Sequence, residues 1–282
     1  MTPNMVRANE VDFAYFEAGQ GPLVLSLHGF PDTAWSFVPV LNRLAAGGYH
    51  AVAPFMRGYP PSGLGPGGDY RIITLGRDAL ALIEALGAQR AFLVGHDWGA
   101  VAAYIAAALA PERIERMVTA ALPHLHRFLF WPSLRQLKRS RYMGFFQLRG
   151  IPERRIVADD FKWLRALIRE WSPGWNFSEE DFRPLKAAFS DPVRLAAALA
   201  YYRAIPRALT ERESWALLYT QIKLPARMIR SADDGCIGPE MFEGQEKFFG
   251  AGFELMTLQG AGHFMHCEQP DAFAHLVLEF IQ

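Results

Sequence analysis

Asp97 lies in a sequence context that could expose its side chain as a nucleophile. Asp97 is the centre of Gly-His-Asp-Trp-Gly (95–99), a Gly-x-Asp-x-Gly pattern. The apolar run 91–94 before it is typical of a buried strand, and the alanine-rich run 100–110 after it is typical of a helix. Strand, sharp turn and helix together form the elbow that exposes a nucleophile in many enzymes, so we predict such an elbow at Asp97. The alternative is a plain surface turn, because glycine and aspartate both favour turns.

A carboxylate nucleophile restricts the chemistry that the chain could carry out. Attack on an ester would give an anhydride, which is less stable than the ester it came from. Attack on a saturated carbon gives an ordinary alkyl ester, which water can then cleave. The electrophile that we expect is therefore an epoxide or a carbon–halogen bond.

Backbone N–H groups at two places are candidates for an oxyanion hole. The N–H of Trp98 directly follows the nucleophile, at the start of the predicted helix. His-Gly-Phe-Pro (28–31) follows the apolar run 22–27, and its Phe30 could supply the second N–H. We expect the two to meet, because α/β sheets bind ligands at the carboxyl ends of their strands. Glycine and proline alone would also explain 28–31 as an ordinary strand-end turn.

A histidine and an aspartate in the C-terminal part are candidates for a base and for the acid that orients it. His263 lies in Gly-Ala-Gly-His-Phe (260–264), a loop between a predicted strand and the last predicted helix, and His266 is its nearest competitor. Asp234 and Asp233 follow an earlier predicted strand, and either could instead be a turn residue or a helix cap. The order nucleophile, acid, histidine is the order that the α/β-hydrolase arrangement requires.

The elements that must position these residues alternate between strand and helix signals. The predicted strands are 22–27, 49–53, 91–94, 116–122, 226–230 and 254–258. The predicted helices of this part are 35–45, 78–86, 100–110 and 271–280. Such alternation predicts an α/β protein with a mostly parallel central sheet flanked by helices.

The pattern changes at Pro123 and becomes helical in character, rich in arginine, tryptophan and phenylalanine. Four large apolar residues fall three or four positions apart, as on one face of a helix: Phe161, Leu164, Ile168 and Trp171. We therefore expect a core domain made of 1–122 and 214–282. A helical cap subdomain, 123–213, is expected to be inserted between its two parts.

These segments resemble the α/β-hydrolase-fold epoxide hydrolases, and the resemblance covers nearly the whole chain. It rests on His-Gly-Phe-Pro (28–31), Gly-His-Asp-Trp-Gly (95–99), Asp234 and Gly-His-Phe (262–264). It implies that Asp97 is the nucleophile, that His263 is the base, and that Asp234 is the acid in preference to Asp233.

The same resemblance implies that two tyrosines of the cap hold the epoxide oxygen. Tyr142 and Tyr202 match the two positions, while helical spacing turns Tyr201 away from the face of Tyr202. A phenol donates a hydrogen bond well while it stays neutral at pH 7. Both tyrosines could instead be packing aromatics. The residues expected to contact the substrate are Phe30, Trp98, Tyr142, Phe145 and Tyr202.

Two positions depart from the family's usual pattern. Ser231 stands where the Gly-x-x-Asp segment that carries the acid usually has glycine. Phe55 stands where the family's Pro-Asp-x-Arg-Gly stretch usually has aspartate. We expect position 55 to be structural rather than chemical, so that the departure leaves the reaction intact.

The function that the resemblance implies is hydrolysis of a small hydrophobic epoxide to a vicinal diol. An alkyl ester on Asp97 would be the intermediate, His263 would activate the water that cleaves it, and no cofactor or metal is needed. Haloalkane dehalogenases are the first alternative, although many carry asparagine where this chain has Phe30. Fluoroacetate dehalogenases usually have arginine at the position of Trp98. The third alternative is a catalytically silent receptor of the same fold for a small ligand.

Composition limits the other classes of function. The 282 residues include 29 basic and 29 acidic side chains, so no nucleic acid or anionic membrane is expected as a partner. Residues 1–20 lack an apolar stretch of signal-peptide length, and the run 100–110 is too short to span a bilayer. Cys236 and Cys267 are the only cysteines, without metal-type spacing, and a cytoplasmic protein is expected. Pairing of the cysteines and formation of a homodimer are left open.

Overall fold

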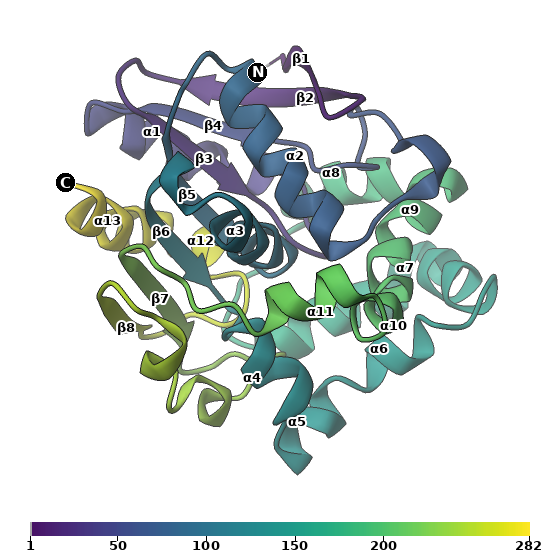
Figure 1. Ribbon diagram of the computed structural model, residues 1–282. Helices are drawn as coiled ribbons and strands as arrows, with labels where there is room; N and C mark the ends of the chain where they lie inside the picture. Colours follow the sequence, from purple (N-terminus) through teal and green to yellow (C-terminus); the bar gives the residue numbers. More distant parts are fainter. Residues whose placement is uncertain (1) are drawn as a thin grey trace.

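An eight-stranded sheet crosses the centre of the protein in the computed structural model, which describes residues 2–282 (Figure 1). Its strands are β1 (Asn4–Ala8), β2 (Val11–Ala18), β3 (Leu23–Leu27), β4 (His50–Pro54), β5 (Ala91–His96), β6 (Ile114–Ala120), β7 (Ala226–Ser231) and β8 (Phe253–Leu258). Their order across the sheet is β1-β2-β4-β3-β5-β6-β7-β8. The pairs β1–β2 and β2–β4 are antiparallel, and the other five pairs are parallel. The predicted α/β class with a mostly parallel sheet is confirmed.

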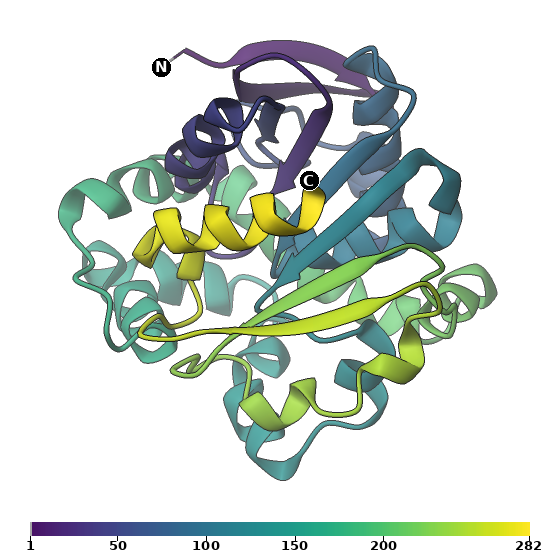
Figure 2. The ribbon, with the colours of Figure 1, turned by 90° about the vertical axis from the view of Figure 1, so that its left-hand side faces the viewer.

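Helices cover both faces of this sheet. They are α1 (Val38–Ala46), α2 (Ile72–Ala85), α3 (Trp98–Leu109), α12 (Met265–Glu268) and α13 (Pro270–Ile281). α2 and α3 pack together on one face, and α1 packs with α13 on the other, where Figure 2 shows α13 in yellow across the strands. All five residues of β3 are buried, as expected of a strand covered on both faces.

The parallel register brings the ends of the central strands to one edge of the sheet. His96 at the end of β5 pairs with Ala120 of β6, and Ala120 pairs with Ile229 of β7. The turns that carry Asp97 and Asp234 follow directly. This is the edge where open α/β sheets bind ligands.

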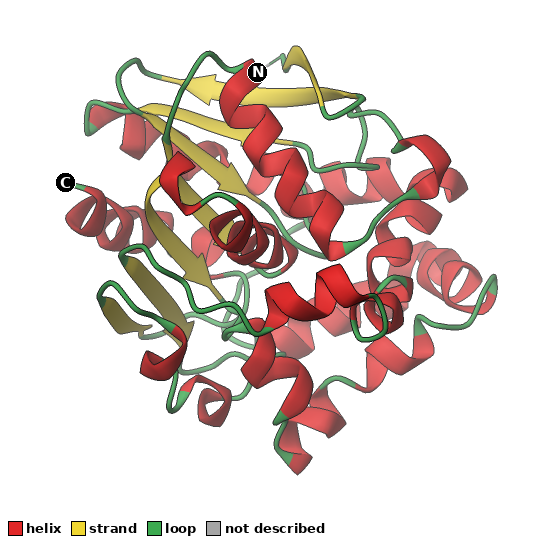
Figure 3. Ribbon diagram, viewed as in Figure 1, coloured by secondary structure: helices red, strands yellow, loops and turns green. Residues whose placement is uncertain are grey.

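Between β6 and β7 the described chain forms helices and no further strand of the sheet, as Figure 3 shows in red. These are α4 (Leu125–Phe130), α5 (Leu134–Arg139), α6 (Arg141–Phe145), α7 (Ile151–Trp171), α8 (Glu179–Phe189), α9 (Pro192–Arg203), α10 (Ile205–Ala208) and α11 (Arg212–Leu218). We call residues 125–218 the helical segment. Its helical character agrees with the prediction, whereas its division from the core as a cap subdomain stays a prediction.

The apolar face expected in the middle of the helical segment lies on α7. Phe161, Leu164, Ile168 and Trp171 are all buried. The backbone leaves helical geometry at residues 158–161, which include Phe161, so the helical face itself is formed by Leu164, Ile168 and Trp171. Within residues 2–282, no helix combines the length and the apolar character that crossing a membrane would need.

Two elements differ from the expectations. The hairpin of β1 and β2 was not expected, because β1 is largely exposed and lacks an apolar run. The helix expected at 78–86 begins six residues earlier, at Ile72. Its first turn has no capping side chain, so the sequence carries no start signal there.

Candidate active site

Asp97 lies at a sharp turn between β5 and α3, with backbone angles φ 51° and ψ −114°. Positive φ is uncommon outside glycine and persists only where the surroundings hold it. A Cβ on Gly95 would lie 2.4 Å from the carbonyl oxygen of Gly99, and a Cβ on Gly99 would lie 2.0 Å from that of Leu27. The chain therefore forms the elbow, and both positions require glycine because backbone atoms approach so closely.

Backbone N–H groups from two strand ends reach the Asp97 carboxylate. The N–H of Phe30, just beyond β3, donates to Asp97 Oδ1 at 2.8 Å. The N–H of Trp98, at the start of α3, acts on the same carboxylate, and both hydrogen bonds act to lower its pKa. These are the two donors predicted for an oxyanion hole. Their use in catalysis stays a prediction.

A buried histidine–aspartate pair faces Asp97. His263 Nδ1 lies 3.0 Å from Asp234 Oδ2, and His263 Nε2 lies 3.9 Å from Asp97 Oδ2. The loops after β7 and β8 supply Asp234 and His263, which are both buried. Asp233 is exposed, so the structure brings Asp234 and not its neighbour to the histidine.

Burial and charge shift the pKa values of these groups. Burial raises the pKa of Asp97 to about 6, although the charge of His263 and the N–H groups of Phe30 and Trp98 oppose it. Burial alone would lower the pKa of His263. The charge and hydrogen bond of Asp234, with the charge of Asp97, outweigh burial and raise that pKa. Above about pH 6 the Asp97 carboxylate is mostly ionised, the form that a nucleophile needs.

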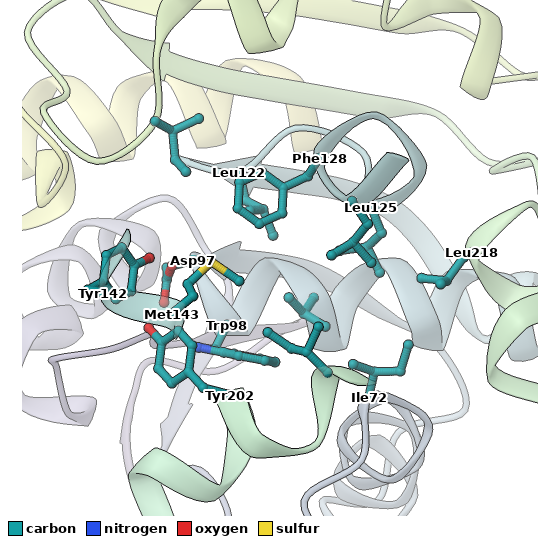
Figure 4. Close-up of a pocket in the computed structure, with 14 residues that line it drawn as sticks. Ile72, Asp97, Trp98, Leu122, Leu125, Phe128, Tyr142, Met143, Tyr202 and Leu218 are labelled. Carbon is teal, nitrogen blue, oxygen red and sulfur yellow. The ribbon is translucent and has the colours of Figure 1, made fainter. Parts of the chain in front are cut away.

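Two tyrosines of the helical segment line the same cavity as Asp97. Tyr142 comes from α6 and Tyr202 from α9, and their ring centroids are 5.7 Å apart. Figure 4 shows both hydroxyls directed toward the Asp97 carboxylate. Burial raises the pKa of both phenols well above 10, so they are neutral donors. Tyr201 instead donates to the carbonyl of Arg57 at 2.7 Å, so it is Tyr202 that reaches the cavity.

The cavity is narrow, with a volume of about 40 Å³, and is partly open to solvent. Figure 4 shows the residues that line it. Its lining is Ile72, Asp97, Trp98, Val101, Leu122, Leu125, Phe128, Leu129, Tyr142, Met143, Tyr202, Ile205, Leu218 and Ile237. Mostly apolar side chains thus surround one carboxylate and two phenols. An apolar pocket with a few convergent polar groups is the usual form of a small-molecule site.

Two residues expected to contact substrate do not line this cavity with their side chains. Phe145 packs beside Trp163 and faces a separate depression on the other side of Tyr142, and Met143 lines the cavity instead. The Phe30 side chain is fully buried and packs edge-on against Tyr202. Only the backbone N–H of Phe30 therefore reaches the site.

Sequence patterns did not mark most of the apolar lining. Val101, Leu122 and Leu218 come from α3, the end of β6 and α11, three elements far apart along the chain. Each has the apolar character of an ordinary core residue, so no local signal separates a cavity wall from packing. Only the helical period of α3 offers a hint, since Val101 lies about one turn beyond Trp98.

Two clusters of buried side chains each contain three candidate metal ligands within 4.8 Å of one another. They are Asp32, His96 and His266, and Asp234, Cys236 and His263. In each cluster a carboxylate oxygen lies 3.0 Å from an imidazole nitrogen, so these two side chains already form a hydrogen bond with each other. His266 is held by Asp32 in this way, which leaves His263 as the histidine beside Asp97. Cys236 and Cys267 are both free thiols.

Comparisons with known proteins agree with this geometry. The family model described as alpha/beta hydrolase fold matches residues 22–270. The AB hydrolase superfamily protein YfhM of Bacillus subtilis is 31% identical, with 98% of this chain and 96% of that protein aligned. Epoxide hydrolase 3 of Mus musculus is 30% identical over 98% of this chain and 76% of its own length. The solved structure of Bacillus megaterium epoxide hydrolase superposes with a TM-score of 0.86, at 26% identity and 99% coverage of both chains.

The chain belongs to the α/β-hydrolase family, and within it to the epoxide hydrolases. It is therefore an enzyme of the hydrolase class.

Proposed function

We propose that the protein hydrolyses a small hydrophobic epoxide to a vicinal diol through an ester on Asp97. One observation carries the proposal: a carboxylate at a strained elbow shares an apolar cavity with two neutral phenols and lies 3.9 Å from the imidazole of a histidine–aspartate pair. The names of the relatives, which are epoxide hydrolases, support the same substrate class.

The first step opens the ring. The Asp97 carboxylate forms a bond to one ring carbon while the bond from that carbon to the epoxide oxygen breaks. The electron pair goes to the oxygen, which takes a proton from Tyr142 or Tyr202 and a hydrogen bond from the other phenol. Positioned neutral donors stabilise the developing negative charge, as electrostatic catalysis requires.

The second step cleaves the ester. His263 Nε2 has no hydrogen-bond partner among residues 2–282, so it is free to accept a proton from water. Asp234 fixes the ring and stabilises its positive form, while the N–H groups of Phe30 and Trp98 hold the tetrahedral oxyanion. As the intermediate collapses, the bond to the alcohol oxygen breaks and that oxygen takes the remaining proton of the added water, which releases the diol and the Asp97 carboxylate. The imidazolium proton returns to the phenolate, so the cycle closes without a metal or cofactor.

The test compares the wild type with Asp97→Ala on styrene oxide and cyclohexene oxide. Diol is expected from the wild type alone. In a single turnover in heavy-oxygen water, the label is expected in Asp97 before it enters the diol, read by mass spectrometry. Label that enters the diol first would contradict the covalent route.

The same assay separates the alternative functions. Release of halide from haloalkanes, without diol from any epoxide, would favour a dehalogenase. Binding of epoxides without turnover, undiminished in Asp97→Ala, would favour a silent receptor. The two phenols beside Asp97 favour the epoxide, because its oxygen needs a proton whereas a leaving halide does not.

A further inference from the structure

The hydroxyl of Tyr142 has a neighbour that the proposed cycle does not use. Cys236 Sγ lies 3.6 Å from the Tyr142 hydroxyl, within hydrogen-bonding distance for sulfur. The two residues are 94 positions apart, and both are buried. The hydroxyl of Tyr202, by contrast, lies beside the Trp98 side chain and forms no hydrogen bond of full geometry among residues 2–282. The two phenols of the cavity are therefore not equivalent.

Hydrogen bonds of the Cys236 backbone fix the position of its thiol. The N–H of Cys236 donates to Asp234 Oδ1 at 2.7 Å, and its carbonyl accepts from Gln136 Nε2 at 3.0 Å. The next residue, Ile237, lines the cavity. Cys236 thus belongs to the loop that carries Asp234. Its hydrogen bonds with Asp234 and Gln136 fix its position relative to Tyr142.

We propose that Cys236 is a positioning residue for Tyr142, with its S–H donating to the phenol oxygen so that the phenol proton points at the epoxide oxygen. The proposal rests on the proposed function. A phenol has one hydrogen and can accept hydrogen bonds at its oxygen, so a donor behind it directs its proton forward. As the ring opens, the O–H bond of Tyr142 breaks and its proton moves to the epoxide oxygen. The phenolate left behind keeps the S–H hydrogen bond, and the thiol itself stays intact.

The surroundings of the thiol suit a donor better than a nucleophile. Burial raises the pKa of Cys236 well above 9, and the charges of Asp234 and Asp97 add to the effect. The group therefore stays as S–H at neutral pH. A thiolate at this place would be open to alkylation by the epoxide itself, because the thiolate is the reactive form of cysteine.

The test is a double-mutant cycle of Cys236→Ala and Tyr142→Phe, with the rates of ester formation and ester hydrolysis measured in single turnovers. Cys236→Ala is expected to slow ester formation roughly tenfold, the size expected for one hydrogen bond to a charged group. In the Tyr142→Phe background it is expected to have no further effect, because the oxygen that the thiol serves is gone. Cys236→Ser, which keeps a donor, should stay within about threefold of the wild type.

Three results would overturn the proposal: additive effects in the cycle, a serine variant as slow as the alanine variant, or ester hydrolysis slowed as much as ester formation. The last would show that the acid loop had moved. Cys267→Ala, at the other cysteine, is the matched control and should match the wild type. Cys236→Val serves in the same comparison if the alanine variant does not fold. Absence of both ester and diol in the wild type would instead reject the proposed function itself.

Discussion

At the scale of single residues, each step of the proposed cycle needs one group in its deprotonated form: Asp97 for ring opening and His263 for ester hydrolysis. Ring opening needs the Asp97 carboxylate ionised, and burial places its pKa at about 6. Ester hydrolysis needs His263 neutral, and its pKa is raised above the usual 6.5. The residue that limits the reaction is therefore expected to change with pH.

Lowering the pH from about 8 to about 5 is expected to stop the two steps in order. Hydrolysis of the ester is lost first, as the pH falls through the raised pKa of His263 and the imidazole becomes protonated. Ring opening is lost only as the pH falls through about 6 and Asp97 takes up a proton. Single-turnover rates across this range would check the order. Loss of ring opening at the higher pH would contradict it.

Adjacent tyrosines offer a second test at the residue scale. Tyr202→Phe removes a phenol from the cavity and is expected to slow ester formation by about a hundredfold, the loss typical of removing one hydrogen-bond donor to a developing negative oxygen. Tyr201→Phe removes only a hydrogen bond to the Arg57 carbonyl, so it is expected to lower the free energy of unfolding by about 1 kcal/mol. Its ester formation should be unchanged. Equal kinetic losses in the two variants would show that Tyr202 acts through packing.

At the scale of elements, the elbow depends on how closely α3 approaches β3. The strand and helix follow from local patterns, since β5 is an apolar run and α3 is rich in alanine. Contact between α3 and β3 brings backbone to backbone and leaves no room for a side chain at Gly99. The geometry of the nucleophile is thus a property of three elements together.

Gly99→Ala is expected to destabilise the protein by about 3 kcal/mol or more, because its Cβ would lie 2.0 Å from the Leu27 carbonyl oxygen. Ester formation should fall with it, since α3 can relieve the clash only by moving the elbow. Chemical denaturation and single-turnover assays measure the two effects. Gly144→Ala is the matched control, because a Cβ at Gly144 meets no atom within 4 Å. A Gly99→Ala protein as stable as the control would contradict the close approach.

The departure at Phe55 has an explanation at this scale. Phe55 is buried and lies 5.3 Å from Phe16, measured between ring centroids. The neighbouring Arg57 makes a buried ion pair with Asp78 of α2 at 2.5 Å. Phe55 is not among the residues that line the cavity, and its structural role stays a prediction.

At the scale of the whole molecule, the helical segment holds both loops of the acid–base pair. The carbonyl of Trp171, at the end of α7, accepts hydrogen bonds from the N–H of Gly235 and of His263, each at 3.0 Å. The hydroxyl of the next residue, Ser172, accepts from the N–H of Phe264 at 3.1 Å. The helical segment therefore fixes the distance between acid and base as well as one wall of the cavity.

Ser172→Ala is expected to slow ester hydrolysis several-fold while ester formation changes little. The variant leaves the buried N–H of Phe264 without its partner, which costs about 1–3 kcal/mol and loosens the loop of His263. Rates of the two steps, with thermal unfolding beside them, measure this. Ser190→Ala, whose exposed hydroxyl bonds only within its own helix end, is the control and should leave both rates unchanged. Loss of ester formation as large as that of hydrolysis would contradict a role confined to the base.

Features that arise within a few residues could be predicted from the amino-acid sequence alone. The elbow at Asp97, the helix face of 161–171 and the mostly parallel sheet follow from apolar period and turn residues, which act locally. The resemblance to the epoxide hydrolase family further predicted that Asp234, Tyr142 and Tyr202 are site residues. The structure places Tyr142 and Tyr202 beside Asp97 in one cavity, and Asp234 beside His263.

Contacts between distant parts of the chain could not be predicted in this way and are known from the folded structure. It placed Tyr202 and not Tyr201 at the cavity, and it left Phe145 outside. It also brought Cys236 to Tyr142 across 94 residues and Trp171 to the acid–base loops. Apolar and aromatic side chains look alike in sequence whether they fill a core or line a site. Which of the two they do is fixed by the packing of helices against the edge of a parallel sheet, and local patterns do not encode it.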